Sequence, residues 1–340
     1  MKIEIRKNPC EAGDITIFRL INNQGNYVEL SSLGAGILAV GVPDRFGRID
    51  NIALGYADPA AYMSDGPCMG KTPGRYANRI AGGKLEIDGE LCQLAVNNGP
   101  NHLHGGPTGF QNRLWDTEIL PDGVRFTYRS ADGEENYPGN LTARVEYRWT
   151  NRNQLEITYT ATTDATTVVN LTNHTYWNLE GADSGCALGH RLRINASRWL
   201  PTDPTLVPTG EIASVEGTPM DFRRPHPIGE RIRDNHNALC FGKGYDNCWV
   251  LDGDGEAVVL TAPSSGRTLT VETDQPGVQV YSGNWLAGAP INRSGRRYLD
   301  YDGIAIEAQG LPDAPNKPGF PQQTLRPVET YRRYIRFTFS

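Results

Sequence analysis

The chain of 340 residues is long enough for one large β domain or two ordinary domains. Gly (38) and Pro (23) exceed their usual share, and Thr, Val, Tyr and Trp are plentiful, which predicts a mainly β protein with many turns. The net charge of −6 argues against a nucleic-acid partner, and no apolar run approaches the roughly 18 residues that a membrane span needs.

The N-terminus and the cysteines indicate where the protein works. Residues 1–6 alternate like a strand and lack the apolar centre of a signal peptide. The six cysteines are scattered, with no C-x-x-C pair, so we interpret them as reduced core thiols: Cys10, Cys68, Cys92, Cys186, Cys240 and Cys248. Both features predict a cytoplasmic protein.

The first hundred residues are expected to form short strands and irregular loops. Residues 32–39 contain a G-x-G-x-x-A string, but the β-like residues that follow it provide no helix N-terminus for a dinucleotide. Residues 85–91 predict a hairpin with an Asp-Gly turn, and residues 97–106 form a polar loop with two histidines.

The rest of the chain predicts further strands with few helices. Alternation indicates strands at residues 124–128, 145–149 and 155–159, and further strands are expected at residues 244–251 and 278–281. Residues 181–240 are rich in proline and loops, with one short helix expected at residues 228–232. Because no linker-like change of composition interrupts the chain, we expect residues 1–340 to form a single domain.

Residues 168–179 carry the most informative pattern and are expected to form one continuous strand. With a period of two, His174 shares a face with Val168, Asn170, Thr172 and Tyr176. Core strands seldom carry such a row of polar side chains, so this face is expected to line a solvated site.

A second polar pattern lies near the C-terminus. In residues 304–309, three apolar side chains form one strand face, while Glu307 and Gln309 point the other way. His174 and Glu307 are therefore a candidate acid and a candidate base, each on a rigid element.

Several other chemistries fit parts of the sequence. His102 and His104 could bind a metal, yet residues 105–109 supply no carboxylate, and a distant group such as Glu307 would have to complete the site. A serine hydrolase lacks its G-x-S-x-G elbow. A glycosidase could use Asp246 with Glu307, although nothing in the sequence pairs these two carboxylates.

A simpler assembly combines one imidazole, one carboxylate and polar groups suited to hydroxyls. Polar groups that could bracket a polyhydroxylated ligand are Asn78, Arg79, His104, Asp246 and Gln279. Aromatic side chains that could cover an apolar sugar face are Tyr176, Trp177 and Trp285.

Six stretches of the chain form an ordered set of motifs: residues 74–80 (GRYANRI), 101–106 (NHLHGG), 173–179 (NHTYWNL), 245–246 (YD), 276–284 (PGVQVYSGN) and 307–316 (EAQGLPDAPN). Together they resemble the aldose 1-epimerase (galactose mutarotase) family. The resemblance implies a large antiparallel β-sandwich that holds a sugar in a groove on one sheet, interconverts its α and β anomers, and uses no cofactor and no metal.

The resemblance also implies roles for individual residues. By position, Glu307 is the general base and His174 the general acid, and the two are expected to face each other across a single hexose ring. His104 is an assisting group. The residues that match hydroxyl-binding positions are Asn78, Arg79, Asp246 and Gln279. A singly protonated acid–base pair of this kind predicts a bell-shaped pH–rate profile.

Two alternative functions remain open. The first is a related 1-epimerase for a pentose, a deoxy-sugar or a sugar phosphate. A sugar phosphate would need additional cations at the groove, which could come from Arg191, Arg193, Arg198, Arg223 and Arg224. The second is a non-catalytic sugar-binding module, which would be expected to lack either the acid or the base. The sequence is compatible with both a monomer and a homodimer.

Overall fold

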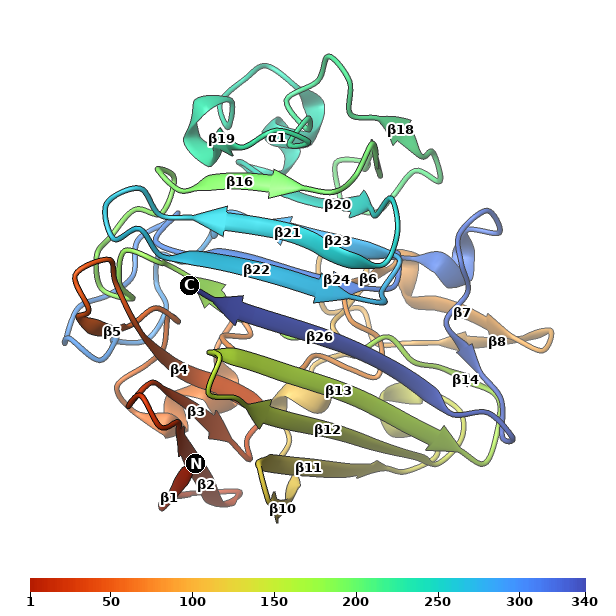
Figure 1. Ribbon diagram of the computed structural model, residues 1–340. Coiled ribbons are helices and arrows are strands. Elements are labelled where there is room, and N and C mark those ends of the chain that lie inside the picture. Colours follow the sequence, from red (N-terminus) through yellow and green to blue (C-terminus); the bar gives the residue numbers. More distant parts are fainter.

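The architecture is a β-sandwich in which one layer is a nine-stranded antiparallel sheet. The computed structural model describes residues 1–340, apart from the side chain of Ser64. The nine strands run in the order β10 (Asp116–Leu120), β11 (Gly123–Ser130), β12 (Leu141–Trp149), β13 (Gln154–Thr163), β26 (Tyr331–Phe339), β22 (Thr268–Thr273), β21 (Gly255–Thr261), β16 (Arg191–Ile194) and β19 (His226–Pro227). Figure 1 shows this sheet as the front layer.

Two further sheets pack against the nine-stranded sheet. One contains β15 (Tyr176–Trp177), β24 (Ile304–Gln309), β23 (Gly277–Tyr281), β20 (Asp246–Val250), β17 (Arg198–Trp199) and β18 (Ala213–Ser214). The other contains β1 (Lys2–Cys10), β2 (Gly13–Ile21), β3 (Tyr27–Ser31), β4 (Gly36–Pro43) and β5 (Ile49–Asn51). The strand pairs of all three sheets are antiparallel, as the family resemblance implied.

The remaining elements are short. Three two-stranded pairs are β6 (Arg79–Ile80) with β9 (His102–Leu103), β7 (Lys84–Ile87) with β8 (Glu90–Gln93), and β14 (Thr167–Val168) with β25 (Thr324–Leu325). The helical segments are α1 (Asn237–Gly242) and the 3-10 turns η1 (Pro59–Ser64), η2 (Ala81–Gly83), η3 (Phe110–Asn112), η4 (Glu134–Asn136), η5 (Ile228–Glu230) and η6 (Ala314–Asn316). The described helices include none long and apolar enough to cross a membrane.

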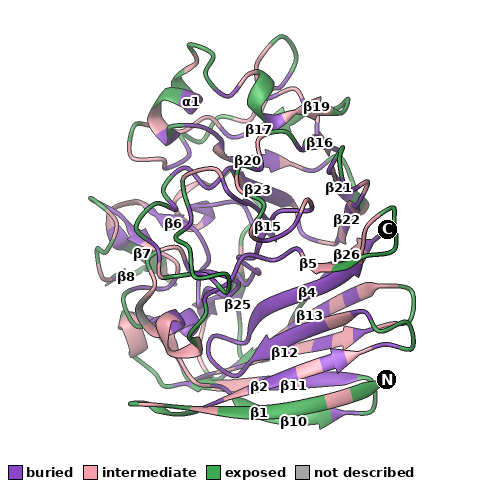
Figure 2. Ribbon diagram, turned by 90° about the vertical axis from the view of Figure 1, so that its left-hand side faces the viewer, coloured by how far each residue is buried: buried purple, intermediate pink, exposed green. Residues whose placement is uncertain are grey.

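The main core lies where the nine-stranded sheet meets the other two sheets. It joins Phe126 and Phe337 of the large sheet with Trp177 and Ile306 of the six-stranded sheet and Phe18 of the five-stranded sheet. Figure 2 shows the buried strand β4 inside this arrangement and the largely exposed strand β1 at its edge. Because one core connects residues from both ends of the chain, we propose that residues 1–340 form a single domain.

Three local expectations need correction. Residues 168–179 form no continuous strand: β14 ends at Val168 and β15 begins at Tyr176, because the intervening backbone pairs with other segments, such as the bond from the Gly70 N–H to the His174 carbonyl. The helix expected at residues 228–232 is only the 3-10 turn η5. Cys186 and Cys240 are exposed thiols and not core residues.

Candidate active site

One face of the six-stranded sheet forms the floor of a cavity with a volume of about 1040 Å³. Directly paired residues of an antiparallel sheet share a face, as do alternate residues of one strand. Tyr176 pairs with Ala305, Glu307 with Gln279, and Asp246 with Tyr281, so these six side chains lie on the same face. The opposite face carries Trp177, Trp249 and Ile306 into the core.

His174 and Glu307 meet in this cavity. The His174 Nε2 atom lies 3.4 Å from the Glu307 Oε1 atom, and both side chains are almost fully buried. His174 Nδ1 and Glu307 Oε2 are buried atoms without a hydrogen-bond partner in the protein. The two groups stand side by side, so the expectation that they face each other across a sugar ring is wrong.

The neighbouring loop at residues 70–71 holds His174 in place. The His174 N–H donates to the Lys71 carbonyl and the Gly70 N–H donates to the His174 carbonyl, both at 2.9 Å. Gly70 has a φ of 72°, and a Cβ there would lie 2.0 Å from the Ile37 carbonyl oxygen, so only glycine fits. Lys71 is itself buried and pairs with Asp65.

Burial shifts the pKa values of both catalytic candidates toward their neutral forms. Loss of solvation lowers the pKa of His174 to about 4 and raises the pKa of Glu307 well above 4.5. Because burial opposes both charges, a single proton shared by the pair rests on Glu307.

His104 lies beside His174, with the two rings perpendicular and their centroids 5.3 Å apart. The Asn78 backbone N–H donates to His104 Nδ1 at 3.1 Å, so the neutral ring carries its proton on Nε2. Burial, followed by the neighbouring His174, lowers the pKa of His104 well below 6.5. This imidazole is therefore a neutral N–H donor.

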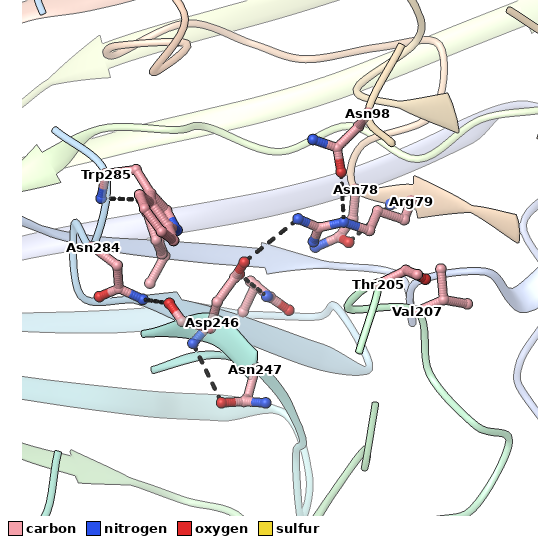
Figure 3. Close-up of polar contacts among 12 residues, drawn as sticks. Asn78, Arg79, Asn98, Thr205, Val207, Asp246, Asn247, Asn284 and Trp285 are labelled. Atoms are coloured by element: carbon pink, nitrogen blue, oxygen red, sulfur yellow. Dashed lines mark hydrogen bonds and ion pairs between the residues drawn. The ribbon is translucent and has the colours of Figure 1, made fainter. Parts of the chain in front are cut away.

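A chain of polar side chains forms one wall of the cavity (Figure 3). Arg79 Nε donates to Asn98 Oδ1 at 3.1 Å, and the Arg79 guanidinium lies 3.6 Å from Asp246 Oδ2. The Gln279 amide donates to Asp246 Oδ1 at 2.6 Å. Gln279 thus orients Asp246 but is not among the residues that line the cavity. The polar residues of this wall that do line the cavity are Asn78, Arg79, Asn98 and Asp246.

Two aromatic candidates prove to have other contacts. Trp177 is fully buried and packs on Phe337 and Phe339, so it lies in the core and away from the cavity. Tyr176 lines the cavity but is almost fully buried, and its hydroxyl donates to the Pro67 carbonyl at 3.0 Å. Trp285 lines the cavity and is 62% exposed.

Other polar candidates also prove structural. Asn170 and Thr172, expected to line the site, are buried and bond to the carbonyls of Ala77 and Ala308. Both ring nitrogens of His102 have protein partners 2.7 Å away, namely the Ala95 carbonyl and the Tyr137 hydroxyl. Among the described residues, no group of three or more His, Cys, Asp or Glu side chains could hold a metal ion.

Sequence reasoning missed Asn98 and Cys68, which both line the cavity. Asn98 belongs to the polar loop at residues 97–106, where its position next to the His104 motif was the one available signal. Cys68 is a buried thiol beside Glu307, and burial raises its pKa.

This fold and cavity define a class: a large β-sandwich with a buried His–Glu pair at the floor of a cavity whose wall carries amide, guanidinium and carboxylate groups, which are suited to a polyhydroxylated ligand. The sequence model of the family described as "Aldose 1-epimerase" matches residues 16–338. The chain belongs to the aldose 1-epimerase family.

Named relatives and solved structures agree with this assignment. The chain is 42% identical to the galactose mutarotase of Homo sapiens, over 98% of this chain and 96% of that protein. It is 39% identical to the aldose 1-epimerase of Escherichia coli (strain K12), over 98% and 99%. A crystal structure of a GalM/aldose epimerase homologue from C. elegans superposes with a TM-score of 0.90 at 33% identity, covering 96% of this chain and 99% of that one.

Proposed function

We propose that this protein is an aldose 1-epimerase that interconverts the α and β anomers of hexoses such as galactose and glucose by opening and closing the ring. The observation that carries this proposal is the His174–Glu307 pair, 3.4 Å apart at the floor of a cavity with a wall of hydroxyl-binding groups. Membership of the aldose 1-epimerase family supports the reaction class.

The spacing of the pair suits the two oxygens that react. The hydroxyl oxygen O1 and the ring oxygen O5 are both bonded to C1, so a base for O1 and an acid for O5 must stand close together. Glu307 removes the proton from O1 while His174 protonates O5, and the C1–O5 bond breaks to give the aldehyde. After rotation about C1–C2, the ring closes on the other face with the two roles reversed.

The reaction requires one proton on the pair. In the free enzyme that proton rests on Glu307, because burial opposes both charges. A bound sugar that donates its O1 hydroxyl to Glu307 favours the carboxylate, and the proton then moves to the imidazole of His174. His104 supplies an additional neutral N–H donor to the sugar.

Binding of the sugar falls to the wall of the cavity. Arg79 and Asn78 offer donors, and Asp246 offers an acceptor to neighbouring hydroxyls. Gln279 acts by orienting Asp246. Tyr176 provides an apolar surface next to His174, with the ring centroids 5.0 Å apart.

A sugar phosphate is a less suitable substrate. Among the described residues that line the cavity, Arg79 is the one arginine, and Asp246 already pairs with it. Two of the arginines considered as extra cations, Arg193 and Arg223, pair instead with Glu256 and Asp221. A neutral sugar therefore matches the charge of the cavity better.

Polarimetry tests the proposed function directly. Freshly dissolved α-D-galactose, α-D-glucose and a pentose are followed to anomeric equilibrium with and without the protein. An accelerated approach to equilibrium with a hexose is expected. Binding without acceleration would instead favour the non-catalytic sugar-binding module and would overturn the proposal.

The cellular setting is also a proposal. All six cysteines are free thiols, and two of them, Cys186 and Cys240, are exposed. Exposed thiols persist in reducing compartments, so we place the protein in the cytoplasm. Its proposed small-molecule partner there is a free sugar. Thiol titration of the protein purified from its native cells checks this, because a disulfide would contradict it.

A further inference from the structure

Trp285 is an exposed aromatic side chain at the cavity that the proposed chemistry leaves without a role. It follows β23 and lies on the opposite side of Asp246 from Arg79 (Figure 3). Its side chain is 62% exposed although it lines the cavity, whereas the other five tryptophans, Trp115, Trp149, Trp177, Trp199 and Trp249, are each at most 5% exposed.

The protein holds Trp285 in position from two directions. Its backbone N–H donates to the Tyr281 hydroxyl at 2.9 Å, and the Tyr281 ring lies 6.5 Å from the His174 ring. The Lys243 ammonium sits 4.4 Å from the centroid of the Trp285 ring. Trp285 therefore contacts Tyr281, which lies near His174, and also Lys243.

The lysine is itself fixed. Lys243 Nζ pairs with Asp300 Oδ2 at 2.5 Å, and Asp300 Oδ1 accepts the Ala287 N–H at 2.9 Å. Trp285 lines the cavity, whereas Lys243 is not among the described residues that line it. An aromatic ring held before the ligand arrives loses less side-chain entropy on binding.

The negative face of an aromatic ring attracts C–H groups and cations. In galactopyranose, O4 is axial, so the hydrogens on C3, C4 and C5 project from one face and make a continuous apolar patch. In glucopyranose, O4 is equatorial and the hydrogens alternate between faces. A flat indole at the side of the site therefore discriminates between these two epimers.

We propose that Trp285, clamped by Lys243, is the residue that makes this epimerase prefer sugars of the galactose configuration, by stacking on their C3–C4–C5 face. This inference rests on the proposed function for its substrate class. It adds a specificity-determining residue to the acid–base pair and the polar wall.

Substitution of Trp285 tests the preference. Trp285→Ala is expected to raise KM for α-D-galactose about two- to ten-fold, with a smaller change for α-D-glucose and little change in kcat. Trp285→Phe should retain most of the preference, and Lys243→Met should lie between them. Phe46→Ala, which removes an aromatic side chain that is 84% exposed in the turn between β4 and β5, is the matched control. An unchanged galactose-to-glucose KM ratio in Trp285→Ala would overturn the proposal.

Fluorescence separates this inference from the proposed function. Because Trp285 is the one exposed tryptophan, D-galactose should change the emission of the wild type at lower concentration than D-glucose, and Trp285→Phe should abolish the change. Emission that responds to galactose without accelerated mutarotation would reject the proposed epimerase function but support stacking of galactose on Trp285. Turnover of galactose with no emission change would reject stacking on Trp285 but support the proposed epimerase function.

Discussion

The Gln279 amide donates a 2.6 Å hydrogen bond to Asp246 across two neighbouring strands of the six-stranded sheet. The two residues are diagonal neighbours in this pair, because Asp246 lies opposite Tyr281 and Gln279 lies opposite Cys248. Gln279, which is not among the residues that line the cavity, therefore orients Asp246, which is.

Gln279→Leu should consequently impair binding more than chemistry. We expect KM for galactose to rise about ten-fold with kcat nearly unchanged, since a hydrogen bond to a charged group is lost. Steady-state polarimetry measures both constants. Gln154→Leu, which removes an amide bonded to Thr338 on the large sheet, is the control. A fall in kcat at constant KM would contradict the orienting role.

Glu307→Gln tests the base. The amide keeps the shape of the side chain but cannot accept the O1 proton, so kcat should fall by about 10²–10⁴-fold while the sugar still binds. Polarimetry gives the rate and tryptophan fluorescence gives the binding. Glu272→Gln, at a surface ion pair with Arg336, should remain active. Retained turnover in Glu307→Gln would refute the assignment.

The pH dependence follows from the direction of the two pKa shifts. Activity needs one proton on the pair, so it is lost at low pH when His174 gains a second proton, and at high pH when Glu307 loses the last one. Since burial lowers the pKa of His174 to about 4 and raises that of Glu307, the acid limb of kcat/KM should lie well below 6.5. Polarimetry across the acid range, with circular dichroism as a check on folding, measures it. An acid limb near 6.5 would show a solvated histidine.

His104 is expected to act as a neutral donor from Nε2. His104→Gln can place an N–H at a similar position, whereas His104→Leu cannot, and both bear the same left-handed backbone at this position, where φ is 53°. We expect His104→Leu to lose about 10²-fold in kcat and His104→Gln to lose much less. Equal losses for the two variants, measured by polarimetry, would exclude the donor role.

Trp177 should matter for stability and Trp285 should not. Trp177→Ala leaves a large cavity against Phe337 and Phe339 and should lower the free energy of unfolding by about 3–5 kcal/mol. Trp285→Ala removes an exposed ring and should change it by less than about 0.5 kcal/mol. Urea unfolding measures both. Similar values for the two would mean that Trp177 is not a core anchor.

Local pattern placed several strands, among them β12 and β24, but it indicated none at β21, β22 or β26. The alternation that put His174 and Tyr176 on one side and Trp177 on the other is what the structure shows, and it also separates Glu307 from Ile306. The hairpin at residues 85–91 formed around Asp88 and Gly89, whose positive φ angles the Asp-Gly pair readily adopts. Periodicity is a property of neighbouring residues, so it is readable from the chain alone.

Local pattern could not tell a cavity from a polar contact with backbone. Asn170 and Thr172 share the alternation of His174, but their partners are carbonyls about a hundred residues away in sequence, which only packing brings near. The same holds for Cys186 and Cys240, whose exposure depends on the loops around them.

From the sequence by itself came the β class, the identity of the polar and aromatic residues, and the family that their order indicates. Tertiary structure decided which of them meet: it brought His174 within 3.4 Å of Glu307, placed Gln279 behind Asp246, and left Trp285 at the cavity while Trp177 entered the core. The physical reason is that distance, burial and the resulting pKa shifts arise from segments far apart in the chain, which no local pattern specifies.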